Sequence, residues 1–172
     1  FSHIHTSNNS HFDSQLPKLA EADLSASYDF SGQWKEKEKV AQLAPYTKYA
    51  FLSCGSVQVE EAKEICRMIY KAGCPMVIAT RGSYGSILYN GKNFYKQEPK
   101  LVEAVDTLGA GDSFATAFLL SYVENLEKNA ENPDMVKESE EIFIKEAMAA
   151  GAEFAAKTCM VQGAFGYGKE IQ

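Results

Sequence analysis

The sequence predicts an α/β fold in which a mostly parallel sheet carries helices on both faces. Short apolar runs typical of strands alternate with segments of helical periodicity, which is the pattern of parallel βαβ units. One run, from Pro75 to Thr80, is apolar without interruption, as expected of a strand buried on both faces. The pair Asn90-Gly91 stands between two short runs and favours a tight hairpin turn, so one antiparallel ribbon should extend the sheet.

The individual elements are expected in a definite order along the chain. Strands are predicted at residues 1–7, 24–30, 49–53, 75–80 and 101–106, and the hairpin at residues 86–96. Helices are predicted at residues 11–22, 59–72, 112–127 and 142–160, where apolar residues recur at roughly helical spacing. Gly73 stands where a helix-ending glycine belongs. A solvated helix face is expected at residues 35–39, and a surface loop at residues 127–139.

Composition and charge narrow the classes of function. The 172 residues are 45% hydrophobic and 23% charged, and no apolar run reaches the ~20 residues that span a bilayer, so a membrane protein is not expected. A net charge of −6 has the wrong sign for binding nucleic acid. The four cysteines lack the spacing of a zinc site or a redox pair, which favours reduced thiols in a cytoplasmic protein. Because the chain lacks an initiator methionine, we expect an N-terminal portion of the protein to precede Phe1.

A glycine-bearing turn ahead of a predicted helix is the first candidate for chemistry. It runs from Asp106 to Asp112 as Asp-Thr-Leu-Gly-Ala-Gly-Asp. The first amides of a helix have no intrahelical partner and can bind an anion, and glycines let a phosphate approach the backbone. Asp112 would repel such an anion unless its charge has a use. A general base is that use, because it could take the proton of a hydroxyl that attacks a bound phosphoryl group.

Two other interpretations of this turn stay open, and a third is excluded. A dinucleotide-binding fingerprint would need a third glycine where the chain has Phe114, and a place after the first strand. The turn could also be purely structural, with Gly109 and Gly111 shaping it and Asp106 or Asp112 capping the helix. A Walker A loop is excluded, because the chain has no Gly-x-x-x-x-Gly-Lys-[Ser/Thr] sequence.

A second glycine turn favours a ligand-binding interpretation of the first. It runs from Thr80 to Gly85, directly after the buried strand. In open α/β sheets ligands bind beyond the carboxyl ends of the strands, so both turns could face one crevice and contact the same phosphate-bearing ligand.

The two turns together resemble a known family. Asp-Thr-x-Gly-Ala-Gly-Asp at residues 106–112 is similar to the signature of the PfkB, or ribokinase-like, sugar kinases, and Thr80-x-Gly82-x-x-Gly85 is similar to their nucleotide-contacting turn. The resemblance covers most of the chain and implies a three-layer, Rossmann-like fold. Residues 1–172 would be the C-terminal, nucleotide-binding and catalytic part of a single ribokinase-like domain, without the N-terminal part and the lid. Softer matches at residues 28–34, 155–158 and 163–165 look most like the fructoselysine 6-kinase branch.

The resemblance implies roles for individual residues. Asp112 would be the catalytic base, and the Gly109-Ala110-Gly111 turn with the amide of Asp112 would form the anion hole. The nucleotide would contact Thr80, Gly82, Gly85, Ala149 and Ala152. Asp106 and Thr107 would lie near a monovalent-cation site, for which K⁺ is the candidate. Asp29 would face the catalytic crevice.

Magnesium is expected with the nucleotide, because the charge on ATP must be neutralised for transfer. The family's Asn-x-x-Glu element is not recognisable, and Gln58-Val59-Glu60-Glu61 occupies its approximate place, with Glu61 as the candidate ligand. His3, His5 and His11 could suggest a metal site, but zinc usually needs three or four protein ligands. Position alone suggests instead that His5, Asn9 and His11 contact the acceptor.

The leading hypothesis is therefore an ATP-dependent kinase for the hydroxyl of a small sugar or sugar-amine adduct such as fructoselysine. Another acceptor, such as ribose, fructose or a nucleoside, is the alternative within the same family. A nucleotide-binding module without catalysis is the alternative from another class. Members of the family often dimerise through the lid, so the resemblance is compatible with a homodimer.

Overall fold

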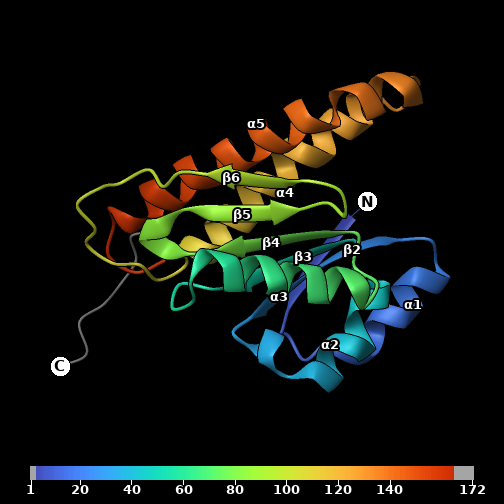
Figure 1. Ribbon diagram of the computed structural model, residues 1–172, viewed down its shortest axis with the longest axis horizontal. Helices are drawn as coiled ribbons and strands as arrows, with labels where there is room; N and C mark the ends of the chain where they lie inside the picture. Colours follow the sequence, from blue (N-terminus) through green and yellow to red (C-terminus); the bar gives the residue numbers. More distant parts are fainter. Residues whose placement is uncertain (1–2, 165–172) are drawn as a thin grey trace. The chain divides into compact units, whose positions relative to one another are not determined.

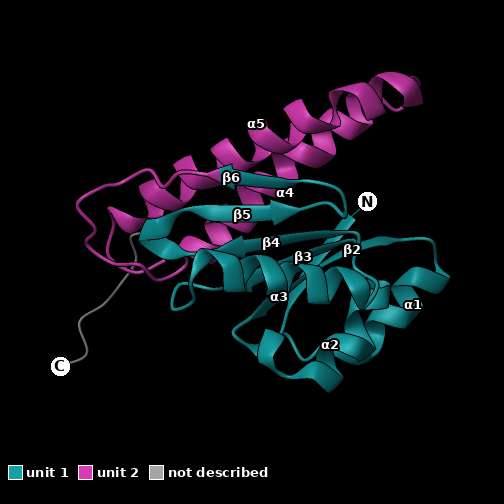
Figure 2. Ribbon diagram, viewed as in Figure 1, with its two compact units in different colours: residues 1–96 teal, residues 97–172 magenta. Residues whose placement is uncertain are grey.

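The structure is a computed structural model that describes residues 3–164 (Figure 1). The chain falls into two compact units, Phe1–Lys96 and Gln97–Gln172, drawn in teal and magenta in Figure 2. Within residues 3–164, no helix is long and apolar enough to cross a membrane.

Unit 1 is built on one six-stranded sheet. Its strands are β1 (His3–Ser7), β2 (Ser25–Ser31), β3 (Tyr49–Ser53), β4 (Met76–Thr80), β5 (Ser86–Tyr89) and β6 (Phe94–Gln97), and they are neighbours in that order. β1 to β4 pair in parallel, and β5 pairs antiparallel to β4. The parallel strands are connected through α1 (Leu16–Glu21), α2 (Lys37–Leu43) and α3 (Val59–Lys71). The predicted α/β fold with a mostly parallel sheet is thereby confirmed.

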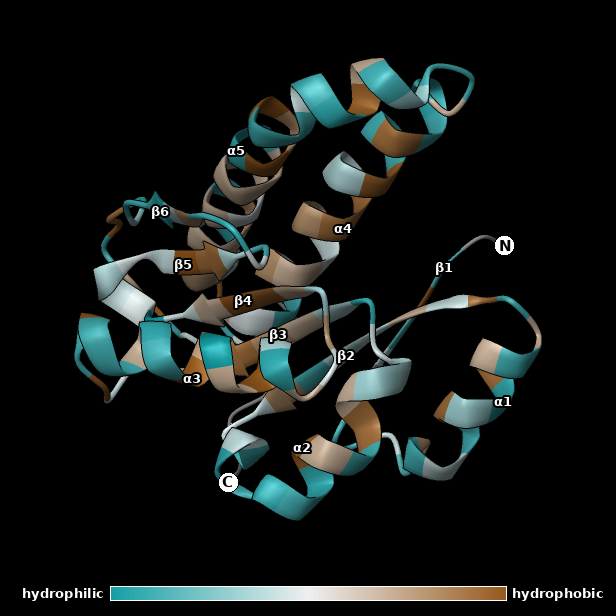
Figure 3. Cartoon of the chain, turned by 45° about the vertical axis from the view of Figure 1, so that its right-hand side comes forward, coloured by the Kyte–Doolittle hydropathy of each residue, from teal (hydrophilic) through white to brown (hydrophobic). Residues whose placement is uncertain are grey.

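One face of this sheet packs against all three helices of unit 1. Successive side chains of a strand point to opposite faces, so every second strand residue reaches this core. The strands contribute Ala26, Tyr28, Phe30, Ala50, Leu52, Val77, Ala79 and Ile87, and the helices Leu16, Val40, Leu43, Ala62, Ile65, Cys66 and Ile69. Figure 3 shows the brown, apolar ribbon of β4 and β5. Burying a large apolar side chain contributes about 1.5–3 kcal/mol, so this layer is the main source of stability in unit 1.

The best-defined helix prediction in unit 1 is confirmed. α3 begins at Val59 and ends at Lys71. Gly73 follows it with a backbone φ of 119°, which residues other than glycine rarely adopt. A Cβ at Gly73 would also lie 3.0 Å from the Cα of Pro45. Glycine is therefore required where the chain turns from α3 towards β4.

The N-terminal helix is shorter than predicted. Residues 11–22 were expected to form one helix, but η1 (Asp13–Gln15) is a 3₁₀ turn and α1 covers only Leu16–Glu21. His11 has φ of 55°, which no helix contains, and Pro17 lies in the first turn of α1, where proline favours a helix start. Two further 3₁₀ turns, η2 (Gln33–Lys35) and η3 (Ala44–Tyr46), flank α2.

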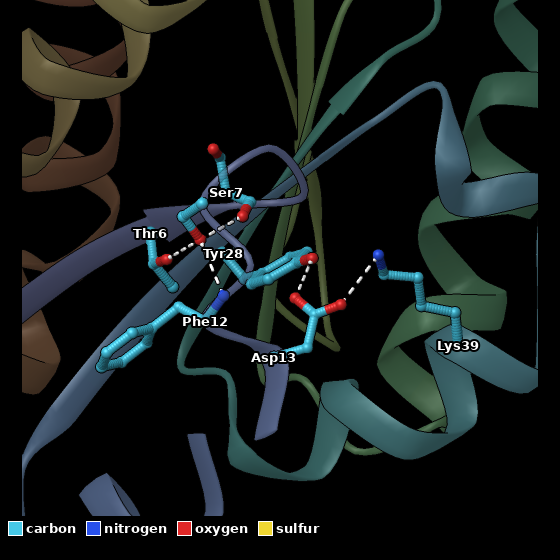
Figure 4. Close-up of polar contacts among 7 residues, drawn as sticks. Thr6, Ser7, Phe12, Asp13, Tyr28 and Lys39 are labelled. Atoms are coloured by element: carbon cyan, nitrogen blue, oxygen red, sulfur yellow. Dashed lines mark hydrogen bonds and ion pairs between the residues drawn. The ribbon is translucent and has the colours of Figure 1, made fainter. Parts of the chain in front are cut away.

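A partly buried hydrogen bond ties the segment after β1 to the core (Figure 4). The hydroxyl of Tyr28 donates to Asp13 Oδ1 at 2.6 Å, and Lys39 Nζ lies 2.9 Å from Asp13 Oδ2. Burial and this hydrogen bond raise the pKa of Tyr28 well above its usual value. Burial alone would raise the pKa of Asp13, but the bonds from Tyr28 and Lys39 outweigh it and lower the pKa. Asp13 thus joins the β1–α1 segment to β2 and α2.

The predicted hairpin is present, but its turn is longer than expected. β5 ends at Tyr89 and β6 begins at Phe94, so four residues connect them instead of the Asn90-Gly91 pair alone. The side chain of Asn90 accepts hydrogen bonds from the amides of Lys92 and Asn93, at 3.1 and 2.9 Å. The amide of Asn90 also donates to the carbonyl of Asn93 at 3.4 Å, so side-chain and backbone bonds close the turn together.

Unit 2 is a hairpin of two long helices, α4 (Ala110–Lys128) and α5 (Pro133–Cys159). The predicted surface loop at residues 127–139 is wrong, because α5 begins within it. Asn132 accepts a hydrogen bond from the amide of Met135 at 3.1 Å, and Pro133 follows in the first turn. An N-cap asparagine followed by proline is a helix start, so the Asn-Pro-Asp sequence signals the beginning of α5.

The predicted strand at residues 101–106 is also wrong. The structure gives this segment no regular secondary structure, and the amides of Val105 and Asp106 both donate to the carbonyl of Cys159, at 2.8 and 3.2 Å. A strand needs a neighbour with which to form a ladder, and the end of α5 takes that place here. Of the softer match at residues 163–165, residue 165 lies outside the described residues.

The two helices of unit 2 approach closely at Gly151. A Cβ there would lie 2.9 Å from the ring of Phe114 and 3.0 Å from its carbonyl oxygen. We therefore predict that Gly151→Val lowers the free energy of unfolding by about 1–3 kcal/mol, because the added methyl groups must push α4 and α5 apart. Urea denaturation followed by circular dichroism measures this.

Thr116→Val is the matched control. Thr116 lies on α4 and is exposed, so the substitution places the same valine side chain in the same hairpin without an interhelical clash. Its effect should stay within about 0.5 kcal/mol, as is usual for surface positions. Equal losses in the two variants would contradict the packing role of Gly151.

Candidate active site

The predicted ligand-binding residues of unit 1 gather towards one edge of the sheet. β1 to β4 run parallel, so their carboxyl ends lie at the same edge. Asn9 follows β1, Asp29 lies near the end of β2, and the turn from Thr80 to Gly85 follows β4. Because ligands of open α/β sheets bind beyond the carboxyl ends of the strands, this edge is the candidate ligand site of unit 1.

The turn after β4 is held by its own backbone. The amide of Arg81 donates to the carbonyl of Gly85 at 2.8 Å, and the amide of Gly85 donates to Gly82 at 3.1 Å. Gly82 and Gly85 have φ of 56° and 79°, so both predicted turn glycines occupy the left-handed region that favours glycine. η4 (Gly82–Tyr84) forms between them. Thr80 Oγ1 donates to the carbonyl of Leu52 at 3.1 Å, which ties the turn to β3.

Two residues of this edge were not predicted from the sequence. Arg81 is 7% exposed, and its Nη2 donates to the carbonyl of Val57 at 3.1 Å. Cys54 is buried beside it, and burial raises the pKa of its thiol to about 12. Arg81 occupies a variable position of the Thr-x-Gly-x-x-Gly pattern, so only its charge within a glycine turn could have drawn attention to it.

The polar side chains of β1 and β2 bond to one another. His5 Nδ1 lies 2.7 Å from Ser27 Oγ, and the His5 ring makes an edge contact with Phe51. Asp29 Oδ1 accepts from the amide of Ser31 at 2.6 Å, where a register shift ends the regular pairing of β2 and β3. Asp29 therefore shapes the end of β2. The other predicted acceptor residues, Asn9 and His11, are exposed in the turn after β1.

In unit 2, Asp106 organises the loop that leads into α4. Its Oδ1 accepts from the amide of Leu108 and its Oδ2 from the amide of Gly163, both at 3.0 Å. These two bonds lower the pKa of Asp106. The carboxylate thus joins the segment before α4 to the segment after α5. Thr107, the other residue predicted near a monovalent cation, is exposed.

The first turn of α4 carries the predicted base. Gly109 is the N-cap in the left-handed region, with φ of 78°, and a Cβ there would lie 2.8 Å from that of Ala164. The helix begins at Ala110, two residues before the predicted start. This brings Asp112 into the first turn, where its side chain is exposed.

Two backbone amides of this turn lack a hydrogen-bond acceptor among the described residues. The amide of Ala110 donates to Thr107 at 3.2 Å, and that of Ser113 donates to Gly109 at 2.9 Å. Between residues 3 and 164, the amides of Gly111 and Asp112 have no hydrogen-bond acceptor. A Cβ at Gly111 would meet nothing within 4 Å, so the backbone is open there. The turn can therefore present two N–H groups and one carboxylate to a ligand.

A buried pair of hydroxyls lies directly behind Asp112. Ser113 Oγ and Thr158 Oγ1 are 2.7 Å apart, and Thr158 Oγ1 donates to the carbonyl of Phe154 at 3.2 Å. Because Thr158 has one hydrogen to donate, Ser113 donates to it, which connects the start of α4 to the end of α5. Sequence patterns did not single out this pair. The predicted nucleotide residues Ala149 and Ala152 lie one turn apart on α5.

No metal centre built from protein groups alone is found among residues 3–164, in which no cluster of three or more His, Cys, Asp or Glu side chains could hold an ion. Glu61 is exposed in the first turn of α3, while Glu60 pairs with Lys63 at 2.8 Å. Magnesium commonly binds through one or two carboxylates together with substrate phosphates. Glu61 could therefore supply one ligand to a metal that arrives with a nucleotide.

The sequence and the structure have clear relatives. Residues 34–164 match the pfkB family of carbohydrate kinases. The chain is 37% identical over 165 residues to a fructosamine kinase of Bacillus subtilis, covering 96% of this chain and 52% of that protein. It is 32% identical over 163 residues to a fructoselysine 6-kinase of Shigella flexneri, covering 94% of this chain and 55% of that protein. The chain thus spans about half the length of these relatives.

Solved structures of kinases share the fold. A Vibrio cholerae fructokinase, solved with fructose, ADP and calcium ion bound, superposes with a TM-score of 0.69 at 18% identity, covering 95% of this chain and 56% of that one. At this identity the likeness concerns the fold. The sequence match spans most of the chain and includes both glycine turns. The chain therefore belongs to the pfkB family of carbohydrate kinases.

Proposed function

We propose that the protein is an ATP-dependent kinase that phosphorylates a hydroxyl of a sugar or a sugar-amine adduct. Membership of the carbohydrate kinase family supports the reaction class. The names of the curated relatives, a fructosamine kinase and a fructoselysine 6-kinase, support a fructosamine as acceptor. The observation that carries the chemistry is the first turn of α4, where an exposed carboxylate adjoins two amides without an acceptor among the described residues.

Asp112 is the general base of the proposed reaction. It accepts the proton of the acceptor hydroxyl while the hydroxyl oxygen forms a bond to the terminal phosphorus of ATP. The bond between that phosphorus and the bridging oxygen breaks, and ADP leaves. An exposed side chain in the first turn of a helix can reach a substrate without moving the backbone, which suits this role.

The amides of Gly111 and Asp112 stabilise the phosphoryl group in transit. In the transition state, negative charge spreads over the equatorial oxygens of this group. The N–H groups at a helix N-terminus point outward and can donate hydrogen bonds to these oxygens. Ala110 contributes less than its place in the motif implies, because its amide already donates to Thr107. Thr80, Gly82 and Gly85 form the nucleotide turn in this scheme, and Ala149 and Ala152 are proposed to lie beside the base.

The proposal also includes two kinds of metal ion, a cellular location and an oligomeric state. Magnesium would enter with the nucleotide, with Glu61 as its one candidate carboxylate, and would neutralise phosphate charge. A monovalent cation such as K⁺ near Asp106 and Thr107 is proposed on the family resemblance alone. A homodimer is proposed on the same basis, and a cytoplasmic location on the spacing of the four cysteines.

The assignment of Asp112 is tested by Asp112→Asn in the full-length protein. We expect kcat to fall about 10²- to 10⁴-fold, the usual contribution of a general base, while the Kd of ATP changes less than about twofold. Coupled detection of ADP measures the first quantity, and isothermal titration calorimetry the second.

Asp134→Asn is the control for this variant. Asp134 also lies in the first turn of a helix and is exposed, with Lys137 Nζ 3.9 Å away. It should keep full turnover. Undiminished kcat in Asp112→Asn would remove Asp112 as the base, and ATP binding without any turnover in the unsubstituted protein would favour a non-catalytic module.

Asp106→Asn should lower kcat/KM by about tenfold, because an amide offers one oxygen where the carboxylate now accepts from two backbone N–H groups. Glu103→Gln removes the same charge from an exposed side chain nearby and should leave kcat/KM unchanged. Hydrogen exchange at Leu108 should be faster only in Asp106→Asn. The same effect in both variants would mean that charge, and not the loop anchor, is responsible.

A panel of acceptors decides the substrate class. Fructosamines, free fructose, ribose and nucleosides are compared at equal concentration by kcat/KM in the full-length protein. We expect fructosamines to exceed the others by at least about tenfold, since buried polar groups that lack their partner penalise a poorer substrate. A preference for ribose or a nucleoside would reject the proposed acceptor but retain the kinase.

A further inference from the structure

Arg81 is a buried cation without a counter-ion among the residues that the structure describes. Its side chain is 7% exposed, and no carboxylate of the described chain lies within ion-pair distance of it. One bond, from Nη2 to the carbonyl of Val57, satisfies part of the guanidinium. The buried Nε has no hydrogen-bond acceptor within residues 3–164. Arginine is rarely buried so completely without a partner.

Such an arrangement is unfavourable in a protein that has no use for it. A buried charge needs an opposite charge or a full set of hydrogen bonds to offset the loss of its hydration. Replacing an arginine of this kind by an apolar residue of similar size is often neutral or stabilising. The presence of Arg81 therefore points to a partner other than the groups of residues 3–164.

The location of Arg81 indicates the chemistry of that partner. Its backbone begins the turn that closes on Gly85, at the carboxyl edge of the parallel sheet. Gly82 leaves open space where a side chain would be. A guanidinium presents its N–H groups in a planar fork that matches phosphate oxygens. An anion with several oxygens fits both the charge and the place.

We propose that Arg81 binds a phosphate oxygen of the nucleotide, an inference that rests on the proposed kinase function. The Val57 carbonyl holds one N–H of the guanidinium, which fixes the orientation of the fork. Nε is then available to the phosphate. Arg81 thus adds positive charge to a site whose other proposed contacts in this turn, Thr80, Gly82 and Gly85, carry none.

The phosphate reaches Arg81 by displacing Tyr84. The Tyr84 ring lies 5.4 Å from the guanidinium carbon and is 62% exposed. Between residues 3 and 164 its hydroxyl makes no hydrogen bond. A cation–π contact at an exposed ring is weak, so a phosphate, which carries full charge, replaces it readily.

A purely structural role for Arg81 makes the opposite prediction. The guanidinium could serve only to join the loop before α3 to the turn after β4, through its bond to the Val57 carbonyl. In that case its loss destabilises the protein and leaves phosphate binding unchanged. If it binds phosphate, its loss weakens binding of ADP and ATP without harming the unliganded fold. Stability and binding therefore distinguish the two roles.

The test is Arg81→Met in the full-length protein. The Kd values of ATP, ADP and adenosine are measured by isothermal titration calorimetry, and Tm is measured without ligand. We expect ATP and ADP to bind about 10- to 100-fold more weakly, as for the loss of a charged hydrogen bond, and adenosine to bind as before. The unliganded Tm should be unchanged or higher.

Two further variants make the outcome decisive. Arg67→Met removes a guanidinium from α3 that lies over Phe94 at 4.8 Å and pairs with Glu64, and it should leave every Kd unchanged. Arg81→Gln keeps a polar side chain but loses the charge, and it replaces Arg81→Met should that variant fail to fold. It should show the same selective loss of ADP.

Unchanged ADP affinity in these Arg81 variants, or equal losses for ADP and adenosine, would overturn the proposal. An unsubstituted protein that binds neither ATP nor ADP would instead reject the kinase function itself. The two failures are therefore distinguishable.

Discussion

In the proposed anion hole, the amides at the start of α4 stay without partners while the loop that carries them is held still. Gly109 makes this possible, because its left-handed conformation turns the chain into the helix where a Cβ would collide with Ala164. Asp106 supplies the rigidity by accepting from two backbone amides on either side of the hairpin. The amides of Gly111 and Asp112 are thus oriented before any ligand arrives, which is the condition for electrostatic stabilisation without reorganisation.

Each unit holds its own candidate residues in place by a different kind of packing. In unit 2, small residues let α4 and α5 approach, and the Ser113–Thr158 hydroxyl pair joins their ends directly behind Asp112. In unit 1, the parallel strands bring their carboxyl ends to one edge, and an apolar core on one face keeps them in register. The glycine turn after β4 can therefore depart from regular structure without disturbing the sheet.

Many of the secondary-structure elements and the family signature could be predicted from local sequence. The boundaries of β3 and α3 follow from apolar periodicity and from Gly73, and the signature at residues 106–112 led to the family. The errors have physical causes. Residues 101–106 have the composition of a strand but no strand beside them, and Pro133 begins a helix only because Asn132 caps it. The hairpin turn lengthened because the side chain of Asn90 competes for the backbone amides.

The sequence by itself determined the α/β class, the place of the two glycine turns and the membership of the family, because these depend on local backbone preferences and on motifs read along the chain. Tertiary structure alone decided which amides of the α4 turn are already occupied and how far each helix extends. It also decided that Arg81 is buried and that no carboxylate within residues 3–164 pairs with it. Hydrogen-bond partners and burial depend on residues distant in the chain, and no local pattern encodes the distance between them.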